Sequence, residues 1–489
     1  MGSCIDRDSS KAGWRMDHSY ARLPELFYTP TLPMPVREPR VIIFNQPLAK
    51  LLGLDLSLEE NAEIFVGNEI PEGALPIAQA YAGHQFGHFT SLGDGRAILL
   101  GEQICPDGSR FDVQLKGPGR TPYSRGGDGR AALGPMLREY IISEAMHALG
   151  IPTTRSLAVA TTGEEVVRAD ILTGAVLTRI AASHIRVGTF QHAAAHEDLA
   201  ALRALADHTR KRHYPDIADG DSSHFEFFQS VMDRQAELIA KWMHVGFIHG
   251  VMNTDNMALS GETIDYGPCA FMDDYDPDTV FSSIDRQGRY AYGNQAAIAR
   301  WNLARLAEAM LPLFAEDQRK AVDLANEALA GFEEKFQHYW LRGMRAKIGI
   351  FNGEDEDITL VNNLLEWMHK NHLDFTNTFR NLSDEGSIAE PSYVDPTFIS
   401  WHERWSSRLT RQSQSTLESV IMMRANNPAV IPRNHKVEEA LAAVTELGDL
   451  SVMERLLAAL AHPYDAVSST EYTLPPPAGS SAYQTYCGT

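Results

Sequence analysis

The chain has 489 residues, of which 44% are hydrophobic and 22% are charged, an ordinary composition for a large globular protein. Asp and Glu outnumber Lys and Arg by 64 to 43, which gives a formal net charge of −21. This acidity argues against a nucleic-acid partner, because proteins that bind polyanions normally carry a basic field. The four cysteines show no paired spacing, which favours a reducing compartment over a disulfide framework or a metal finger.

The N-terminal residues contain no apolar run typical of a signal peptide and no Arg-rich segment typical of a transit peptide. The longest apolar stretches of the chain are much shorter than the ~20 residues that a membrane helix requires. We therefore expect a cytoplasmic protein without a membrane partner, and we expect it to be a monomer.

Strands and glycine-rich turns predominate before about residue 190. Short apolar runs predict strands at 41–44, 97–100, 111–115, 157–160 and 175–177. A Pro-Asp-Gly turn at 106–108 predicts that the second and third of these strands pair antiparallel. A helix is predicted over 133–149, because its apolar residues form one stripe and Gly150 follows it.

After about residue 190 the chain is predicted to be mostly helical. Amphipathic patterns predict helices at 197–212, 225–245, 295–313 and 318–345, and the acidic run at 354–357 is expected to be a solvated loop. Strands followed by helices indicate an α+β fold with a small β-rich N-lobe and a large helical C-lobe. The cleft between the two lobes is the expected ligand site.

A glycine-rich turn and a lysine mark the first candidate site. Gly93-Asp94-Gly95-Arg96 precedes the strand at 97–100, and glycine permits the close approach that a phosphate-covering loop requires, although the same tetrapeptide is also a good turn. About twenty residues later, Lys116 ends a strand in a pattern similar to the protein-kinase lysine that binds phosphates and pairs with a helix glutamate. Glu139 is the expected partner, with Glu144 as the alternative.

The second candidate site is similar to the catalytic loop of protein kinases. That loop begins with a His and ends with an Asn, which binds Mg²⁺ together with the Asp of a later Asp-Phe-Gly sequence. The matching residues here are His249, Asn256 and the Asp265 of Asp265-Tyr266-Gly267. One amide oxygen, one carboxylate and the phosphates of a nucleotide suffice for Mg²⁺.

One position of this loop differs from a kinase. Val251 occupies the place of the kinase base and cannot accept a proton, whereas Asp255 is the only carboxylate in the loop. An intact metal site without that base indicates either a catalytically silent protein or chemistry that has moved to another residue.

Longer strings resemble the selenoprotein O family. They include YAGHQFGH at 81–88, GDGRAILLGE from Gly93, the run from Gln114 to Ala158, and HGVMNTDNMALSGETIDYGPCAFMD from His249. The resemblance covers most of the chain and implies a protein-kinase-like two-lobed fold with extra N- and C-terminal segments. It also implies a protein adenylyltransferase that binds ATP flipped relative to kinases and transfers AMP to Ser, Thr or Tyr hydroxyls of protein substrates, releasing pyrophosphate.

The resemblance also implies a role for individual residues. Nucleotide contacts are expected at Gly93, Gly95, Arg96, Lys116, Asp128, Gly129, Arg179, Arg186 and Asp265. Mg²⁺, or Mn²⁺, is expected on Asn256 and Asp265, and the catalytic residues are expected to be Asp255 as proton acceptor with the Lys116–Glu139 pair. For Asp255, the positioning of Asn256 is an equally favoured role.

We also predict that the chain is divided into five segments. They are an N-terminal extension at 1–80 that packs on the core, a kinase-like N-lobe at 81–190, a kinase-like C-lobe at 191–350, a helical extension at 351–467, and a flexible tail at 468–489 that ends near a cysteine.

Two arginines support a flipped nucleotide on physical grounds. Arg179 follows a strand where a kinase would bind adenine, and Arg186 comes seven residues later. Guanidinium groups bind phosphate well and adenine edges poorly, so phosphate is expected at this end of the cleft. The alternative for either arginine is a surface ion pair.

Two other functions stay open from the sequence. An ATP-dependent phosphotransferase is suggested by His249-Gly250, and a catalytically silent pseudokinase scaffold that binds nucleotide is suggested by Val251. A reversible disulfide between Cys269 and Cys487 is also proposed, with a buried Cys269 and a free tail thiol as its alternative.

Overall fold

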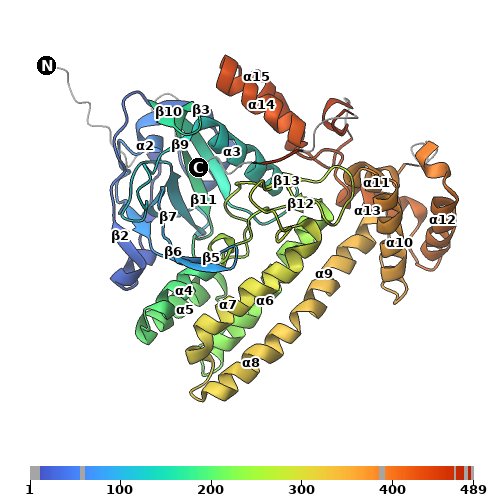
Figure 1. The fold of residues 1–489 in the computed structure, drawn as a ribbon, viewed down its shortest axis with the longest axis horizontal. Helices are drawn as coiled ribbons and strands as arrows, with labels where there is room; N and C mark the ends of the chain where they lie inside the picture. Colours follow the sequence, from blue (N-terminus) through green and yellow to red (C-terminus); the bar gives the residue numbers. More distant parts are fainter. Residues whose placement is uncertain (1–11, 56–60, 385–390, 467–469, 478–482, 486–489) are drawn as a thin grey trace.

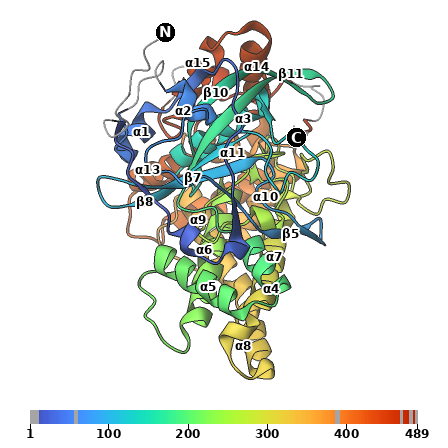
Figure 2. The ribbon, with the colours of Figure 1, turned by 90° about the vertical axis from the view of Figure 1, so that its left-hand side faces the viewer.

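The computed structural model describes residues 12–55, 61–384, 391–466, 470–477 and 483–485. It has a β-rich lobe and a larger helical lobe, so the predicted α+β fold class is confirmed (Figures 1 and 2). No helix among these residues is long and apolar enough to cross a membrane.

One antiparallel sheet of nine strands, counted over the described residues, forms the β-rich lobe. Its order is β2-β4-β7-β8-β11-β10-β3, with β1 paired to β7 and β9 paired to β11. The strands are β1 Met16–Asp17, β2 Tyr28–Pro30, β3 Arg40–Phe44, β4 Ile77–Gln79, β7 Ala97–Ile104, β8 Arg110–Lys116, β9 Ala131–Ala132, β10 Arg155–Val167 and β11 Ile171–Ala181. The predicted hairpin of β7 and β8 is present, and Gly108 in its turn has a φ of +84°.

The described residues between 12 and 80 contribute strands to this sheet. They supply β1 to β4 and two short helices, α1 Gln46–Leu52 and α2 Ala62–Val66. Leu52 and Phe65 of these helices pack in one hydrophobic core with Val113 and Val176 of the sheet. One sheet and one core therefore extend across the predicted boundary at residue 80, and the five-segment division itself stays a prediction.

The predicted helix after the hairpin is α3, Leu133–Ala148. Its stripe of Leu137, Ile141 and Ala145 is fully buried and packs in the same core as Leu177 of β11. Gly150, with a φ of +75°, follows the helix as expected. The helix packs against β10 and β11, and β11 carries Arg179.

Six helices form the main part of the helical lobe. They are α4 Val187–Ala195, α5 Leu199–His213, α6 Ser223–His244, α7 Gln295–Phe314, α8 Gln318–Ala330 and α9 Phe332–Lys347. The prediction of one helix over 318–345 is wrong, because the helical segment is interrupted at Gly331. Before this residue α8 packs against α7, and after it α9 packs mainly against α6. α4 was not predicted, since nearly all its residues are buried and it has no polar face.

The C-terminal helices pack in two places. α10 Asp357–Lys370, α11 Phe375–Asn381, α12 Pro396–Leu409 and α13 Thr416–Asn426 form a second core at the far end of the helical lobe (Figure 1). α14 Asn434–Leu447 and α15 Ser451–Leu460 pack against α3. The acidic run is not fully solvated as predicted, because Asp357 begins α10, is buried and pairs with Arg345 and Arg408.

The remaining elements are short. Near the cleft lie the hairpin of β5 Ala82–Gln85 and β6 His88–Ser91, the pair of β12 Phe247–Ile248 and β13 Ala270–Phe271, and the 3₁₀ helix η4 Thr254–Asn256. The other 3₁₀ helices are η2 Tyr20–Arg22, η3 Glu25–Phe27, η5 Tyr292–Asn294, η7 Pro391–Val394 and η8 Thr470–Tyr472.

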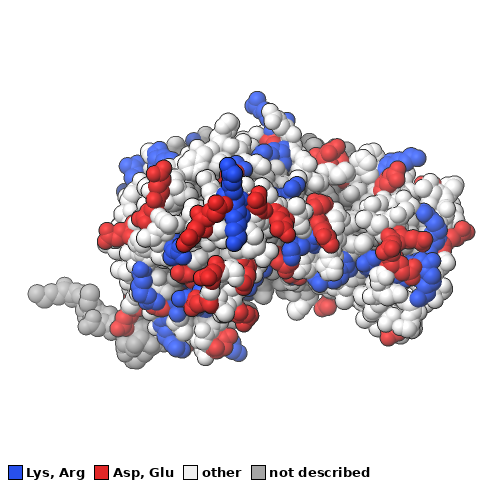
Figure 3. Space-filling view, turned by 90° about the horizontal axis from the view of Figure 1, so that it is seen from below, with Lys and Arg blue, Asp and Glu red and all other residues white. Residues whose placement is uncertain are grey.

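The surface charge is mixed where it can be seen. On the face in Figure 3, Lys and Arg side chains are interspersed with Asp and Glu. That face therefore offers no extended basic area to a polyanion.

Candidate functional site

A cavity of about 550 Å³ lies between the two lobes. The residues predicted to bind nucleotide or metal all line it: Gly93, Gly95, Arg96, Lys116, Asp128, Gly129, Arg179, Arg186, Asn256 and Asp265. Asp255 lines it too, and Glu139 lies behind Lys116 as its ion-pair partner. Tertiary folding thus gathers around one cavity residues that lie as far apart in the chain as Gly93 and Asp265.

The lysine and its glutamate form the predicted pair. Lys116 Nζ lies 2.6 Å from Glu139 Oε2, and both side chains are buried. The alternative partner, Glu144, instead pairs with Arg155 at 2.6 Å. Burial lowers the pKa of Lys116, but Glu139 and Asp265 both act to keep it protonated.

Asp265 is the centre of the charge network. Its Oδ1 accepts hydrogen bonds from Lys116 Nζ at 3.1 Å and from Arg179 Nη2 at 2.6 Å, and its Oδ2 accepts one from Arg186 Nη1 at 3.0 Å. Burial acts to raise the pKa of this carboxyl, but the Arg179, Lys116 and Arg186 cations hold it well below its usual range. Asp265 is therefore ionised.

The two arginines are not surface ion pairs. Arg179 is 1% exposed and Arg186 is 3% exposed. Arg179 Nε donates to Glu139 Oε1 at 2.8 Å, while the Arg186 guanidinium lies 4.5 Å from the centre of the Tyr81 ring. Arg186 Nε is buried and has no hydrogen-bond partner among the described residues. Neither arginine is therefore the surface ion pair that the sequence left open.

Cations and acids are equal in number at this end of the cavity. Lys116, Arg179 and Arg186 face the carboxylates of Glu139 and Asp265. A third acid, Asp94, lies 3.9 Å from Arg186, but burial raises its pKa to about 6. At pH 7 Asp94 is still mostly ionised, so the local charge is close to neutral inside a strongly acidic protein, which suits a phosphate group better than an acidic surface would.

The glycines of the first motif are required by close packing, which the sequence did not indicate. A Cβ on Gly93, whose φ is +124°, would lie 2.5 Å from the Tyr123 ring, and a Cβ on Gly95 would lie 2.9 Å from the Tyr123 carbonyl oxygen. Gly129 is similarly closed off by the carbonyl oxygen of Gly119. These glycines let the turn pack against the 117–130 loop.

Asp128 lies at the outer rim of the cavity. Both of its carboxylate oxygens accept hydrogen bonds from Arg168, at 2.9 and 3.0 Å, and the Arg130 backbone N–H donates to Oδ1 at 2.9 Å. The charge of Asp128 is thus already paired within the protein. Its predicted contact with the nucleotide must therefore come from atoms of Asp128 that Arg168 does not bind.

The candidate metal ligands offer hard oxygen donors. The Asn256 amide donates through Nδ2 to the Val251 carbonyl oxygen at 2.9 Å, which leaves its Oδ1 free to accept or to ligate. Asp265 supplies an ionised carboxylate in the same cavity. No group of three or more His, Cys, Asp or Glu suited to a metal occurs among the described residues. One amide and one carboxylate fit an ion that takes its other ligands from phosphates and water, as Mg²⁺ does.

Asp255, like Asp94, differs from Asp265 in having a raised pKa. Its Oδ1 is buried without a hydrogen-bond partner among the described residues, and burial raises its pKa to about 6. Its backbone carbonyl oxygen accepts from Arg186 Nη1 at 2.9 Å. A carboxyl with a pKa near neutrality suits proton transfer, but its role stays a prediction.

Sequence reasoning missed two residues of the site. Asp94 was interpreted only as part of a turn, although an acid between two glycines that precede a strand could have been noticed as a partner for the arginines. Tyr81 stacks on Arg186 from 105 positions away, and no local pattern could indicate that contact.

His84 and His88 lie on the β5–β6 hairpin, where His84 Nδ1 is 2.8 Å from Gln191 Nε2 and His88 is exposed.

A second cavity of about 660 Å³ adjoins the first. The two share Arg96, Lys116 and Gly267, and the second extends between the start of α3, the start of β11, α14 and residues 483–485. It gives a route from the protein surface to the predicted phosphate site.

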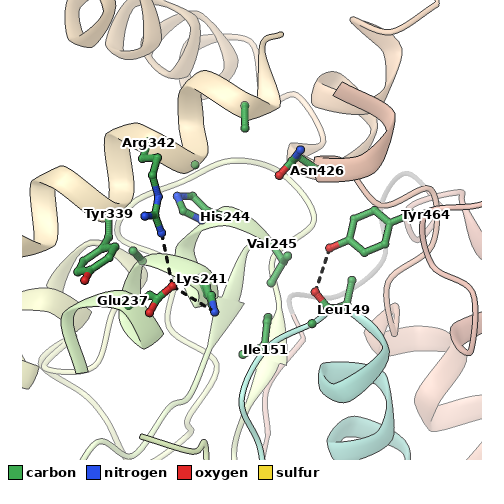
Figure 4. A pocket seen from close by; sticks show the side chains of 14 residues that line it. Leu149, Ile151, Glu237, Lys241, His244, Val245, Tyr339, Arg342, Asn426 and Tyr464 are labelled. Atoms are coloured by element: carbon green, nitrogen blue, oxygen red, sulfur yellow. Dashed lines mark hydrogen bonds and ion pairs between the residues drawn. The ribbon is translucent and has the colours of Figure 1, made fainter. Parts of the chain in front are cut away.

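A third cavity, of about 260 Å³, lies away from this site (Figure 4). It is bounded by the end of α3, by α6 and α9, and by Asn426 and Tyr464. At its rim Glu237 pairs with Lys241 and Arg342, each at 3.4 Å. It contains none of the predicted site residues.

Comparison with known proteins identifies the family of the chain. The family model described as "Protein adenylyltransferase SelO" matches residues 14–461. Three similar proteins are named protein nucleotidyltransferase YdiU. The one from Halalkalibacterium halodurans is 59% identical over 489 residues, with 99% of each chain covered. The one from Syntrophotalea carbinolica is 58% identical over 488 residues, also with 99% of each chain covered. The one from Brevibacillus brevis is 60% identical over 481 residues, with 98% of each chain covered. The chain therefore belongs to the protein adenylyltransferase SelO family.

Proposed function

We propose that this chain transfers AMP from ATP to Ser, Thr or Tyr hydroxyls of protein substrates, with ATP bound in the opposite direction to that in protein kinases. The observation that carries the proposal is the convergence of Lys116, Arg179 and Arg186 on Asp265 at the buried end of the cavity. A terminal phosphate fits that cluster far better than adenine does. The membership of the family and the names of its relatives support nucleotidyl transfer.

The proposed reaction follows from this direction. With the γ-phosphate bound by the buried cations, the α-phosphorus faces the open side of the cleft. A substrate hydroxyl attacks the α-phosphorus, the new P–O bond forms, and the bond to the β-phosphate oxygen breaks to release pyrophosphate. Asp255 accepts the hydroxyl proton, and the buried cations stabilise the negative charge on the leaving pyrophosphate.

A divalent cation completes the proposed site. Asn256 and Asp265 would hold Mg²⁺ or Mn²⁺ next to the phosphates, and the ion would supply charge neutralisation at the reacting phosphorus. Asp265 is already paired with three cations, so we propose that the nucleotide phosphates take over part of that pairing when ATP and the metal bind.

Two labelled nucleotides test the function. The protein is incubated with Mg²⁺, a desalted nucleotide-free cell lysate as acceptor, and either α-³²P-ATP or γ-³²P-ATP. Label in protein from the α position only is the expected result. Label from γ only would identify a phosphotransferase, and binding of ATP without either label would identify a silent scaffold. The buried Val251 at the kinase base position disfavours phosphotransfer.

The other expectations stay proposals. We propose a cytoplasmic monomer whose partners are ATP and proteins with accessible hydroxyls, without nucleic acid or membrane.

A further inference from the structure

An N-lobe hairpin makes direct hydrogen bonds to the loop that carries Asp255. β5 and β6 lie outside the main sheet, between β4 and β7 in the chain, and β5 contacts η4 and α4 of the helical lobe. In both ribbon views β5 lies at the side of the sheet that faces α7 (Figures 1 and 2). The hairpin therefore belongs to one lobe by sequence and to the other by its contacts.

Two side chains of the loop accept from the backbone of this hairpin. The His84 backbone N–H donates to Thr254 Oγ1 at 2.7 Å, and the Phe86 backbone N–H donates to Asn253 Oδ1 at 3.1 Å. Thr254 and Asn253 directly precede Asp255, and they are 0% and 3% exposed. Both acceptor side chains are buried and both bonds are partly buried, so water competes with them less than with exposed bonds.

The helical lobe supports the same contact from the other side. Tyr290 donates through its hydroxyl to Asn253 Oδ1 at 2.5 Å, and its ring packs edge to face on Phe86. Phe86 has a φ of +50°, a conformation that bulky residues rarely adopt, and Gly87 follows with +88°. The turn of the hairpin is thus held in a costly conformation against the loop.

Gly83 brings β5 against the carboxylate itself. A Cβ on Gly83 would lie 2.3 Å from Asp255 Oδ1 and 2.8 Å from its Cγ. The φ of Gly83 is not positive, so space and not backbone conformation explains the glycine. The wall against which the carboxylate lies is therefore the β5 backbone.

We propose that the β5–β6 hairpin, through Thr254 and Asn253, is the device that positions the Asp255 carboxylate for AMP transfer. Thr254 and Asn253 act as positioning residues: Thr254 does not line the cavity, and the Asn253 amide oxygen is bonded to the hairpin and to Tyr290. The inference rests on the proposed function, since its readout is AMP transfer.

The test compares Thr254→Val with Thr254→Ser. Valine keeps the shape of threonine but cannot accept from the His84 N–H, whereas serine keeps the acceptor. For each variant we measure kcat for transfer from α-³²P-ATP to proteins of a desalted lysate, the KM for ATP, the Kd for ATP by calorimetry, and the unfolding midpoint. Thr209→Val is the matched control, because Thr209 is equally buried in α5 and donates only to the Leu205 carbonyl oxygen of its own helix.

We expect Thr254→Val to lower kcat by about 10- to 100-fold, the cost of a small displacement of a reacting group, with the KM and Kd for ATP unchanged. Thr254→Ser should restore most of the lost kcat, and Thr209→Val should retain the wild-type rate. If Thr254→Val does not fold, Tyr290→Phe removes one donor to Asn253 and should lower kcat several-fold without changing ATP affinity.

Three results would overturn the inference. They are an unchanged kcat in a folded Thr254→Val, a parallel loss of kcat and ATP affinity, and a Thr254→Ser variant no better than Thr254→Val. A wild-type protein that transfers no AMP would instead refute the proposed function, so the two failures are distinguishable.

Discussion

Asp265 combines backbone strain with ion pairing. Its φ of +62° lies in the left-handed region, which Asp and Asn tolerate better than other residues with a side chain. In that conformation its carboxylate reaches Lys116, Arg179 and Arg186 together. Three ion pairs offset the strain, which is typical of functional sites.

Asp265→Asn should abolish AMP transfer and also destabilise the fold. Asparagine tolerates the positive φ but lacks the charge, so three buried cations would face only Glu139 and the more distant Asp94, and the free energy of unfolding should fall by about 3–5 kcal/mol. Asp265→Ala should destabilise the fold still more, because alanine adds strain at this φ. Label transfer and urea unfolding check both effects. Wild-type transfer by Asp265→Asn at saturating Mg²⁺ would disprove the metal role.

Arg186→Ala and Arg179→Ala should weaken ATP far more than AMP. Each arginine is expected to contact a terminal phosphate, and a charged hydrogen bond is worth about 1.5–3 kcal/mol, or about 10- to 150-fold in Kd. Calorimetric titration with ATP and with AMP measures the two losses. Equal losses for the two nucleotides would show that the nucleotide is not flipped as proposed. Arg168→Ala, at the outer rim, provides a comparison variant with a smaller expected effect on ATP.

At the scale of a helix, α9 buries a lysine without a carboxylate partner. The Lys347 ammonium lies 4.4 Å from the Phe379 ring centre and 5.3 Å from that of Phe375, and no salt bridge joins it to a described acid. Burial lowers the pKa of Lys347 to about 7. The rings stabilise the cation only in part.

This lysine should make stability depend on pH. Between about pH 7 and the ordinary lysine pKa near ~10.4, the unfolded chain binds a proton that the folded protein does not, so stability rises with pH across this window. It is lowest below about pH 7, where the buried ammonium is charged. Lys347→Met should therefore raise the unfolding midpoint most at pH 6.5 and hardly at all at pH 10. A gain that is equal at both pH values, or a loss at pH 6.5, would contradict this account.

At the scale of the whole molecule, the described end of the tail contacts the segment after Asp265. Thr485 Oγ1 donates to the Pro268 carbonyl oxygen at 2.8 Å, and Tyr483 and Arg138 are joined by a 2.7 Å hydrogen bond. Arg138 also donates to the Cys269 carbonyl oxygen at 2.7 Å. Cys269 is fully buried, and burial raises its pKa to about 11, while Cys487 lies outside the described residues.

A disulfide between Cys269 and Cys487 stays a prediction, and it should form slowly. The thiolate is the reactive form, and a buried thiol with a raised pKa supplies little of it at pH 7. Peptide mapping of oxidised protein over several hours should give a linked peptide, and AMP transfer should change on adding dithiothreitol. Thr485→Ala should slow the linkage by loosening the tail. No linked peptide, or activity indifferent to reductant in wild type and in Cys487→Ser, would end this proposal.

Local sequence patterns correctly predicted the elements whose structure depends on neighbouring residues. The β7–β8 hairpin and α3 followed from turn chemistry and apolar spacing, and the positions of Lys116, Asn256 and Asp265 followed from motifs. The same patterns failed for α8 and α9, whose shared amphipathic signal continues through Gly331. Local patterns also failed for Asp357. Its acidic neighbours indicated a solvated loop, but Asp357 is buried and pairs with Arg345 and Arg408.

Only the tertiary structure decided how these parts act together. From the sequence we expected Arg179 and Arg186 to bind phosphate, but a surface ion pair was also compatible with the pattern. The burial of the two arginines depends on the packing of both lobes. Asp94, Tyr81 and the β5–β6 hairpin reach the site through contacts between residues about 90 to 170 positions apart, as in the bond from the His84 N–H to Thr254 Oγ1. The sequence thus determined the chemical groups, and the fold determined their charge, burial and orientation, since those properties arise from neighbours that no local pattern specifies.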